Sequence, residues 1–145
     1  MKKRKVHMTG LIHLHMTVNA KISPDFTELS REKAQEFVNK LMRITDMKPL
    51  GPLNWSDAVD LDFPGQSFVQ MITTSHCSLH FFADTNEIYF DLYSCKEYDH
   101  NAIVGLLNEV FGLKEYHGIL YNRANGRAPQ VRKIESNAMV MKARA

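Results

Sequence analysis

Alternating apolar and polar positions mark the first structured part of the chain. Residues 10–19, GLIHLHMTVN, alternate with period two and predict a strand with one buried face. Apolar residues recur every three to four positions over residues 31–46, the spacing of a helix that packs one face on a core. Ser30 stands directly before this stretch, and serine is a preferred N-cap, so the helix is expected to begin after it.

Strand patterns dominate the middle of the chain. Three alternating runs, bounded by turn residues, predict the strands Ser67–Thr74, Cys77–Ala83 and Glu87–Ser94. Before them, Asp57, Asp60 and Asp62 alternate with apolar residues and predict a short edge strand.

The remaining elements complete the expected fold class. A second helix is expected over residues 101–111, ended by Gly112, and a last strand over Tyr116–Asn122. This order predicts an α+β fold: a two-layer sandwich of an antiparallel-rich sheet with two helices on one face. Periodicity weakens and positive charge rises after Arg123. We therefore expect one domain over residues 1–123 and a basic, loosely ordered tail over 124–145.

The turn near Asp84 predicts a hairpin that sorts the polar residues. A two-residue loop at Thr85-Asn86 pairs Asp84 with Glu87, and His76 then lies opposite Cys95. Period two separates a core face from a polar face. The core face carries Cys77, Leu79, Phe81, Ala83, Ile88, Phe90 and Leu92; the polar face carries His76, Ser78, His80, Phe82, Tyr89, Asp91, Tyr93 and Cys95. Cys77 is thus expected in the core, and Cys95 near Ser75.

Composition and charge exclude several classes of protein. With 44% hydrophobic and 23% charged residues the chain has a globular composition, not a disordered one. No apolar run approaches the roughly 20 residues of a membrane span, and histidines interrupt the segment after the basic start, so neither a membrane anchor nor a secretory signal is expected. The positive charge gathers at the two ends, which is unlike a nucleic-acid groove. A cytoplasmic protein without nucleic-acid partners is expected.

Histidine spacing raises one alternative site. His13 and His15 lie two residues apart on one strand face, a spacing that can hold zinc if His7 or His117 supplies a third ligand. Two histidines without a fixed third ligand give only weak support for a metal site. Strand histidines that are satisfied by other protein groups are the simpler explanation, so our main interpretation contains no metal.

One motif resembles a known family. The segments ITTSHCSLH, residues 72–80, and YFDLYSC, residues 89–95, resemble the small bacterial and archaeal S-adenosylmethionine decarboxylases. The family pattern has a processed serine followed by His, a second His five residues after the serine, and a Cys fifteen residues later; Ser75, His76, His80 and Cys95 match it. A serine eight residues before the processed one is matched by Ser67. The resemblance covers about residues 61–123.

The resemblance implies a pyruvoyl-dependent enzyme. Ser75 would attack the Thr74 carbonyl, and chain cleavage would leave a pyruvoyl group that forms a Schiff base with the substrate amine. The resemblance assigns Ser67 and His80 to processing and Cys95 to proton donation. It also places substrate-binding positions at Asp84, at Leu61 or Phe63, and at His76. A homodimer with active sites between subunits, and a role in spermidine synthesis, are implied as well.

Several residues depart from the family pattern. Thr74 replaces a glutamate before the processed serine, Asp84 replaces a longer glutamate, and Phe68 replaces a glycine after Ser67. These positions concern processing and substrate choice. Arginine or ornithine therefore stays open as the substrate beside S-adenosylmethionine, and so does an unprocessed, non-catalytic homologue that acts as a binding or regulatory subunit. Because five residues of regular strand put Ser75 and His80 on opposite faces, a bulge near His76 is expected if the two cooperate.

Overall fold

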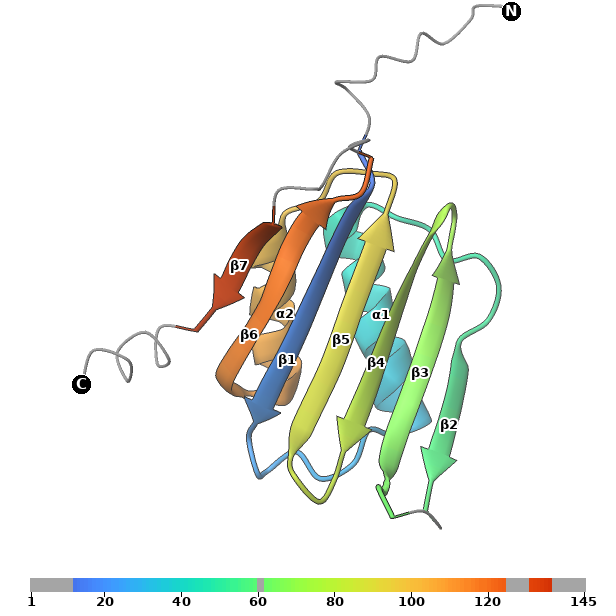
Figure 1. Cartoon of the computed structure of the whole chain (residues 1–145). Helices are drawn as coiled ribbons and strands as arrows, with labels where there is room; N and C mark the ends of the chain where they lie inside the picture. Colours follow the sequence, from blue (N-terminus) through green and yellow to red (C-terminus); the bar gives the residue numbers. More distant parts are fainter. Residues whose placement is uncertain (1–11, 60–61, 125–130, 137–145) are drawn as a thin grey trace, which may run out of the picture.

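A single antiparallel sheet forms one layer of the described structure. The computed structural model describes residues 12–59, 62–124 and 131–136. Its elements are β1 (Leu14–Ile22), α1 (Arg31–Thr45), β2 (Asn54–Ala58), β3 (Gly65–Ile72), β4 (Ser75–Phe82), β5 (Glu87–Ser94), α2 (His100–Phe111), β6 (Leu113–Asn122) and β7 (Val131–Glu135). The strands lie in the order β2-β3-β4-β5-β1-β6-β7 (Figure 1).

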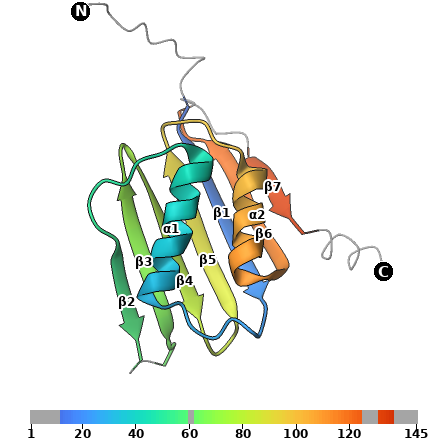
Figure 2. The ribbon, with the colours of Figure 1, turned by 180° about the vertical axis from the view of Figure 1, so that it is seen from behind.

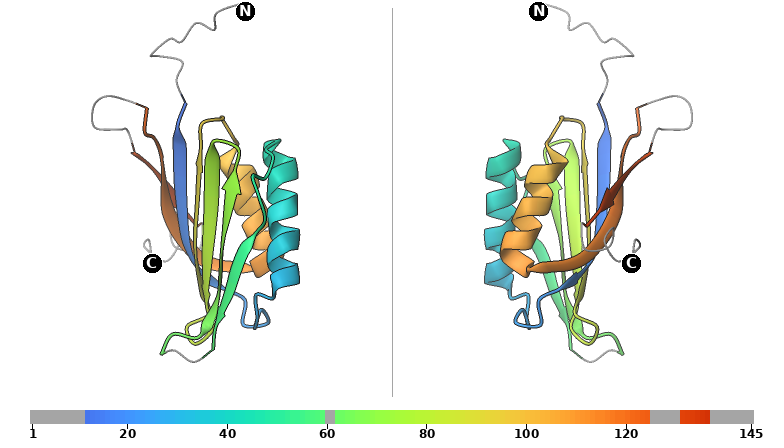
Figure 3. Two further views of the ribbon diagram at one scale, coloured as in Figure 1. Left: turned by 90° about the vertical axis from the view of Figure 1, so that its right-hand side faces the viewer. Right: turned by 90° about the vertical axis from the view of Figure 1, so that its left-hand side faces the viewer.

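The sheet and the helices form two layers. Both helices cover one face of the sheet (Figure 2), and the edge-on views show no described element over the other face (Figure 3). We call this second side the open face. The predicted α+β sandwich with two helices on one face is confirmed.

Capping residues set the ends of the helices. Ser30 accepts a hydrogen bond from the backbone N–H of Lys33 at 3.1 Å, as predicted for the N-cap of α1. Asp99 does the same for α2 by accepting from the N–H of Asn101. Gly112 ends α2 with a φ of 69°, a left-handed conformation that glycine adopts without strain.

The core lies between the two layers. Phe37 of α1 is fully buried, and its ring centroid lies within 6.0 Å of those of Phe68, Phe90 and Phe111. The alternation predicted for β1 is confirmed, because Met16 and Val18 are fully buried. Burial of such side chains contributes about 1.5–3 kcal/mol each, so this layer fixes which side of each strand faces the helices.

The C-terminal segment departs from the predicted loose tail. Residues 131–135 form β7, which pairs antiparallel with β6 and buries Ile134. The expectation of a loose tail is therefore wrong for these residues, because one apolar side chain and an unpaired edge of β6 suffice to hold a short strand. Residues 125–130 and 137–145 lie outside the described residues. The short edge strand is present as β2, but at Asn54–Ala58, earlier than the aspartate pattern indicated.

The hairpin between β4 and β5 has a longer loop than predicted. Four residues, 83–86, connect the strands, so every pair moves by two: Ser75 pairs with Ser94, and His76 with Tyr93. A two-residue type I′ loop needs positive φ at both positions, and here Asn86 alone has it, at 54°. A shift of the strand register by two residues keeps each side chain on its predicted face of the sheet. Ala83 is the exception, since it lies exposed in the loop.

No helix among the described residues is long and apolar enough to span a membrane.

Candidate active site

The turn between β3 and β4 holds Ser75 at the end of the sheet. Ile72 and Ser75 form the closing pair, so Thr73 and Thr74 alone make the loop. Thr74 has a φ of 57°, a left-handed conformation that costs a non-glycine residue roughly 1–2 kcal/mol. For a β-branched side chain this is a true outlier. The peptide bond between Thr74 and Ser75 is therefore flanked by a strained residue.

Ser75 points toward the helix side of the sheet and is 5% exposed. Its hydroxyl donates a hydrogen bond to Oγ of Ser94 at 3.0 Å. Ser94 is fully buried, and its Oγ also accepts from the backbone N–H of Lys96 at 2.9 Å. The sequence analysis did not identify Ser94, because the predicted hairpin register paired Ser75 with Lys96. A prediction with a four-residue loop would have paired Ser75 with Ser94.

Cys95 lies beside the same peptide bond. Its Sγ is 2.7 Å from Oγ1 of Thr74, whose hydroxyl donates to the carbonyl of Thr73 at 2.6 Å. Because the single Thr74 hydroxyl proton is used there, the Cys95 thiol is the donor to Thr74. A cavity of about 370 Å³ opens at this point and is lined in part by Lys48, Thr74, Ser75 and Cys95. The predicted proximity of Ser75 and Cys95 is confirmed.

Cys77 differs sharply from Cys95. It is fully buried among core side chains, as predicted, whereas Cys95 is exposed. Burial, with a smaller contribution from the charge of Asp91, raises the pKa of the Cys77 thiol to about 12. Cys77 therefore stays protonated and acts as a small apolar side chain.

Ser67 and His80 form a second polar group, apart from the first. They are a cross-strand pair on the open face, with Ser67 Oγ 2.7 Å from His80 Nδ1. His80 is five residues from Ser75 along an unbroken strand, which is about 16 Å. The bulge expected near His76 is absent, because β4 keeps regular pairing with both neighbours from Ser75 to Phe82. Within one chain, His80 does not reach Ser75.

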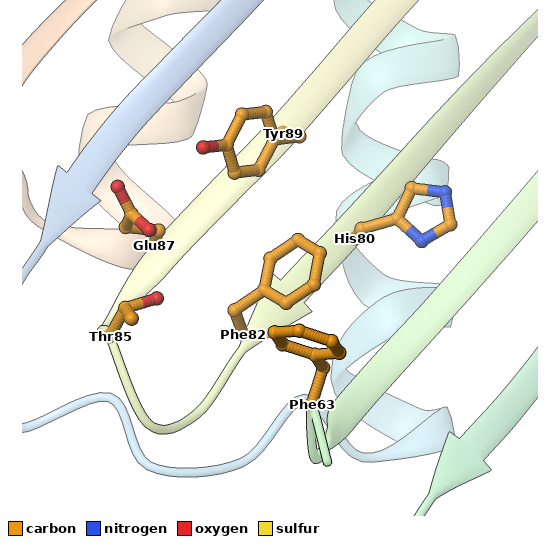
Figure 4. A pocket seen from close by; sticks show the side chains of 6 residues that line it. All are labelled: Phe63, His80, Phe82, Thr85, Glu87 and Tyr89. Carbon is orange, nitrogen blue, oxygen red and sulfur yellow. The ribbon is translucent and has the colours of Figure 1, made fainter. Parts of the chain in front are cut away.

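An apolar pocket lies at the His80 end of β4. It has a volume of about 440 Å³, and its lining side chains are Phe63, His80, Phe82, Thr85, Glu87 and Tyr89 (Figure 4). Phe82 and Tyr89 pack edge to face, with ring centroids 5.5 Å apart. Phe63 is 73% exposed at the rim. The predicted substrate position Phe63 is thus beside His80, Asp84 is exposed in the adjoining loop, and Leu61 lies outside the described residues.

His13, just before β1, and His15 of β1 contact different partners. His13 Nδ1 is 2.5 Å from the hydroxyl of Tyr93, whereas His15 Nε2 is 2.8 Å from Oδ2 of Asp91. His117 pairs with Asn19, four residues further along β1, and His7 lies outside the described residues. Among the described residues, the group with metal-ligand spacing is His15, His76 and Asp91.

The surroundings of Asp91 favour the ionised form of its carboxyl group. Burial opposes its ionisation, but the hydrogen bonds from His15 and Ser78 and the charges of His15 and His76 outweigh burial, and the pKa of the Asp91 carboxyl is lowered. The imidazole of His76, expected as a substrate contact, lies on the open face near Asp91 and Tyr93. Ser75 has the opposite parity on β4, so the two neighbours face different sides of the sheet.

A family model matches most of the chain. The family model described as S-adenosylmethionine decarboxylase matches residues 15–124. This range begins in β1 and runs to the end of β6, so it includes both polar groups and extends well beyond the segment that carries the motif. A search of curated proteins found no match.

Proposed function

Because this chain belongs to the S-adenosylmethionine decarboxylase family, we propose that it is a self-processing, pyruvoyl-dependent decarboxylase. Its substrate in this proposal is S-adenosylmethionine, and its product is the aminopropyl donor for spermidine synthesis. The observation that carries the proposal is the strained turn of Thr73 and Thr74 directly before Ser75, with Cys95 in contact with Thr74.

The turn supports self-cleavage in three ways. Strain at Thr74 would be released when its peptide bond breaks, Thr74 is exposed in the two-residue loop, and Ser75 carries a hydroxyl on the adjoining residue. The hydroxyl of Ser75 adds to the Thr74 carbonyl carbon, the peptide C–N bond breaks, and an ester replaces it. Elimination then releases residues 1–74 with a terminal carboxylate and leaves dehydroalanine at position 75. Water converts the dehydroalanine to a pyruvoyl group and ammonia.

The residues around Ser75 fit a pyruvoyl group at this position. Such a group supplies a ketone that binds an amine and accepts electrons during decarboxylation, as pyridoxal phosphate does. Ser94, hydrogen-bonded to Ser75 in the intact chain, would hold the new terminus at the end of β4. The Cys95 thiol contacts Oγ1 of Thr74 in the intact chain, so it lies beside the site, where it could return a proton to carbon.

A second copy of the chain would complete the site. Ser67 and His80, implied in processing, lie on the open face about 16 Å from Ser75 in one chain. The same face exposes at least 40% of three large apolar residues, Val69, Met71 and Tyr89. Exposed apolar side chains favour contact with another protein surface. If two open faces meet around a twofold axis that reverses the strands, the Ser75 end of one sheet lies over the His80 end of the other. We therefore propose a homodimer whose sites combine residues from both chains.

The His80 end would then bind the part of the substrate remote from the reacting carbon. Phe82 and Phe63 offer aromatic faces, and Asp84 and Glu87 add negative charge near them. Aromatic faces and carboxylates both favour a cation. S-adenosylmethionine is a cation with an aromatic base and fits this surface. Arginine and ornithine are cations too, and remain the alternative substrates.

Intact mass analysis of the purified protein tests the proposal. Wild type should give two fragments, residues 1–74 and 75–145, and the second should carry a ketone that hydroxylamine labels. Ser75→Ala should give one full-length chain without decarboxylase activity. Ser56→Ala, on the exposed edge strand, is the matched control and should cleave normally. A full-length, inactive wild type would instead support the non-catalytic homologue.

Subunit mixing tests the shared site. Ser75→Ala and His80→Ala chains, each expected to be inactive alone, are co-expressed with different tags and purified as mixed dimers. A mixed dimer has one site with both changes and one with neither, so it should regain about a quarter to a half of the wild-type activity. Mixed dimers without activity would contradict a site built from two chains, while leaving the cleavage result untouched.

A further inference from the structure

Three side chains from three neighbouring strands converge on the open face, apart from Ser75 and from the pocket near Phe63. His76 on β4 and His15 on β1 both pair with Tyr93 of β5, one from each side. Asp91 lies two residues before Tyr93 on the same face of β5. Regular antiparallel pairing therefore places two imidazoles in one row and a carboxylate in the next.

The donor atoms of these side chains lie close together. His15 Nε2 is 2.8 Å and His76 Nε2 is 3.9 Å from Oδ2 of Asp91, and all three atoms are within 4.8 Å of one another. Zinc bonds of about 2.0–2.1 Å put tetrahedral ligand atoms about 3.3 Å apart, so shifts of about 1 Å would suffice. We propose that His15, His76 and Asp91 bind one divalent transition-metal ion, for which Zn²⁺ is the best match.

The donor set and its surroundings favour this ion class over Mg²⁺ or Ca²⁺. Two imidazole nitrogens suit zinc and its neighbours, whereas Mg²⁺ and Ca²⁺ require oxygen ligands. Ser78 donates a short hydrogen bond to Oδ1 of Asp91, which leaves Oδ2 for the metal and fixes the carboxylate. A cavity of about 370 Å³, lined by His13, His76, Tyr93 and Arg123, borders the group. In the single chain, it leaves room for a further ligand such as water.

One residue opposes the ion. Arg123 Nη1 is 3.5 Å from Nδ1 of His15, and its guanidinium lies 5.1 Å from the Tyr93 ring centroid. Since arginine only donates, this contact needs an unprotonated Nδ1 on His15 and hence a proton on Nε2. Metal binding through Nε2 reverses that arrangement: Nε2 gives up its proton, and Nδ1 carries one that faces Arg123. The guanidinium must therefore turn away when the ion binds.

Titration with metal ions tests whether the group binds an ion. Full-length protein is freed of metal with a chelator, dialysed, and titrated with Co²⁺, whose visible absorption reports four-coordinate nitrogen and oxygen ligands. Zn²⁺ is then added to displace Co²⁺. We expect each chain to bind one Co²⁺, and one added Zn²⁺ to displace it. Protein with Mg²⁺ alone is the blank and should show no visible absorption. The readout is metal binding, so it does not rest on the proposed function.

Variants distinguish a specific metal site from non-specific metal binding to surface histidines. His15→Gln or Asp91→Asn should weaken binding by more than about 100-fold, and Ser78→Ala by about tenfold. His117→Gln, an exposed strand histidine outside the group, is the matched control and should bind as wild type does. Arg123→Gln changes an exposed residue without disturbing the fold, and should bind about three- to tenfold more tightly because a nearby positive charge is removed.

Each contrary result would count against the site. If His117→Gln weakens binding as much as His15→Gln, the protein binds metal through surface histidines in general. If Arg123→Gln leaves the affinity unchanged, the ion does not lie at His15. Absence of the Co²⁺ spectrum in the wild-type protein would reduce the group to a hydrogen bond between His15 and Asp91.

Discussion

Oγ1 of Thr74 and Sγ of Cys95 are 2.7 Å apart, although 21 positions separate them in the chain. This contact joins the residue before the proposed cleavage point to the proposed proton donor. In the proposed cleavage, a threonine at position 74 is compatible with processing, even though the family resemblance led us to expect a glutamate here. The group attacked in this proposal is a backbone carbonyl, and we propose that the threonine side chain orients the thiol instead.

The strain at Thr74 can be measured. In a Ser75→Ala background, which stays intact, Thr74→Gly should raise the free energy of unfolding by up to about 1 kcal/mol, because glycine adopts a φ of 57° without a Cβ clash. In the Ser75 background the same change should slow cleavage, since less strain is released. Thr73→Gly is the matched control: φ is not positive there, so it should destabilise the turn. Faster cleavage in Thr74→Gly would show that strain does not drive the reaction.

The two cysteines should separate stability from chemistry. Cys77→Ala removes a fully buried side chain and should cost on the order of 1 kcal/mol, with cleavage and turnover retained. Cys95→Ala should fold and cleave but lose most turnover. Denaturant unfolding and decarboxylase assays of both variants check this. A folded Cys77→Ala protein without turnover would contradict the assignment.

The buried thiol also predicts a pH dependence of stability. Burial raises the pKa of Cys77 from an ordinary 9.0 to about 12, so the unfolded chain loses this proton at lower pH than the folded chain. Stability contributed by the thiol is complete below pH 9 and falls as pH rises toward 12, by at most about 1.4 kcal/mol per pH unit. Unfolding of Ser75→Ala protein at pH 8 and pH 10 should show the loss. Adding Cys77→Ala should reduce it, leaving the smaller part due to Tyr98, whose pKa burial also raises.

Close backbone approach predicts one intolerant glycine. A Cβ at Gly118 would lie 1.7 Å from the carbonyl oxygen of Thr17, so Gly118→Ala must push β6 away from β1. We expect a loss of about 2–4 kcal/mol in the free energy of unfolding. Gly105→Ala, in α2, meets no atom within 4 Å and should instead stabilise the helix by up to about 1 kcal/mol. Equal thermal midpoints for the two variants would contradict the sheet register.

The fold was accessible from the sequence because its signals are local. Periodicity and caps such as Ser30 gave both helices within one residue at each end, and period two gave the buried faces of β1, β4 and β5. The hairpin register was not accessible in the same way. It depends on φ at Asn86, and the choice between loops of two and four residues leaves the polar and apolar faces unchanged.

The candidate site was accessible in part for a related reason. The spacing of Ser75 and Cys95 brought them together correctly, but Ser94 and the separation of His80 from Ser75 depend on register and on an unbroken β4. The group of His15, His76 and Asp91 joins residues from three strands. The sequence analysis paired His13 with His15 because their spacing can be read directly from the chain. The proximity of His15 and His76 across β5 depends on the strand order and register.

The position of β1 has a consequence for the cleaved molecule. A break after Thr74 would divide the strands into two peptides, β1 to β3 in one and β4 to β7 in the other. Since β1 lies between β5 and β6, and β3 borders β4, the peptides interleave along three shared strand edges. They would stay together without a covalent link, as a heterodimer of fragments. Its melting would depend on protein concentration, and a fully separated pair would need to meet again before it could refold.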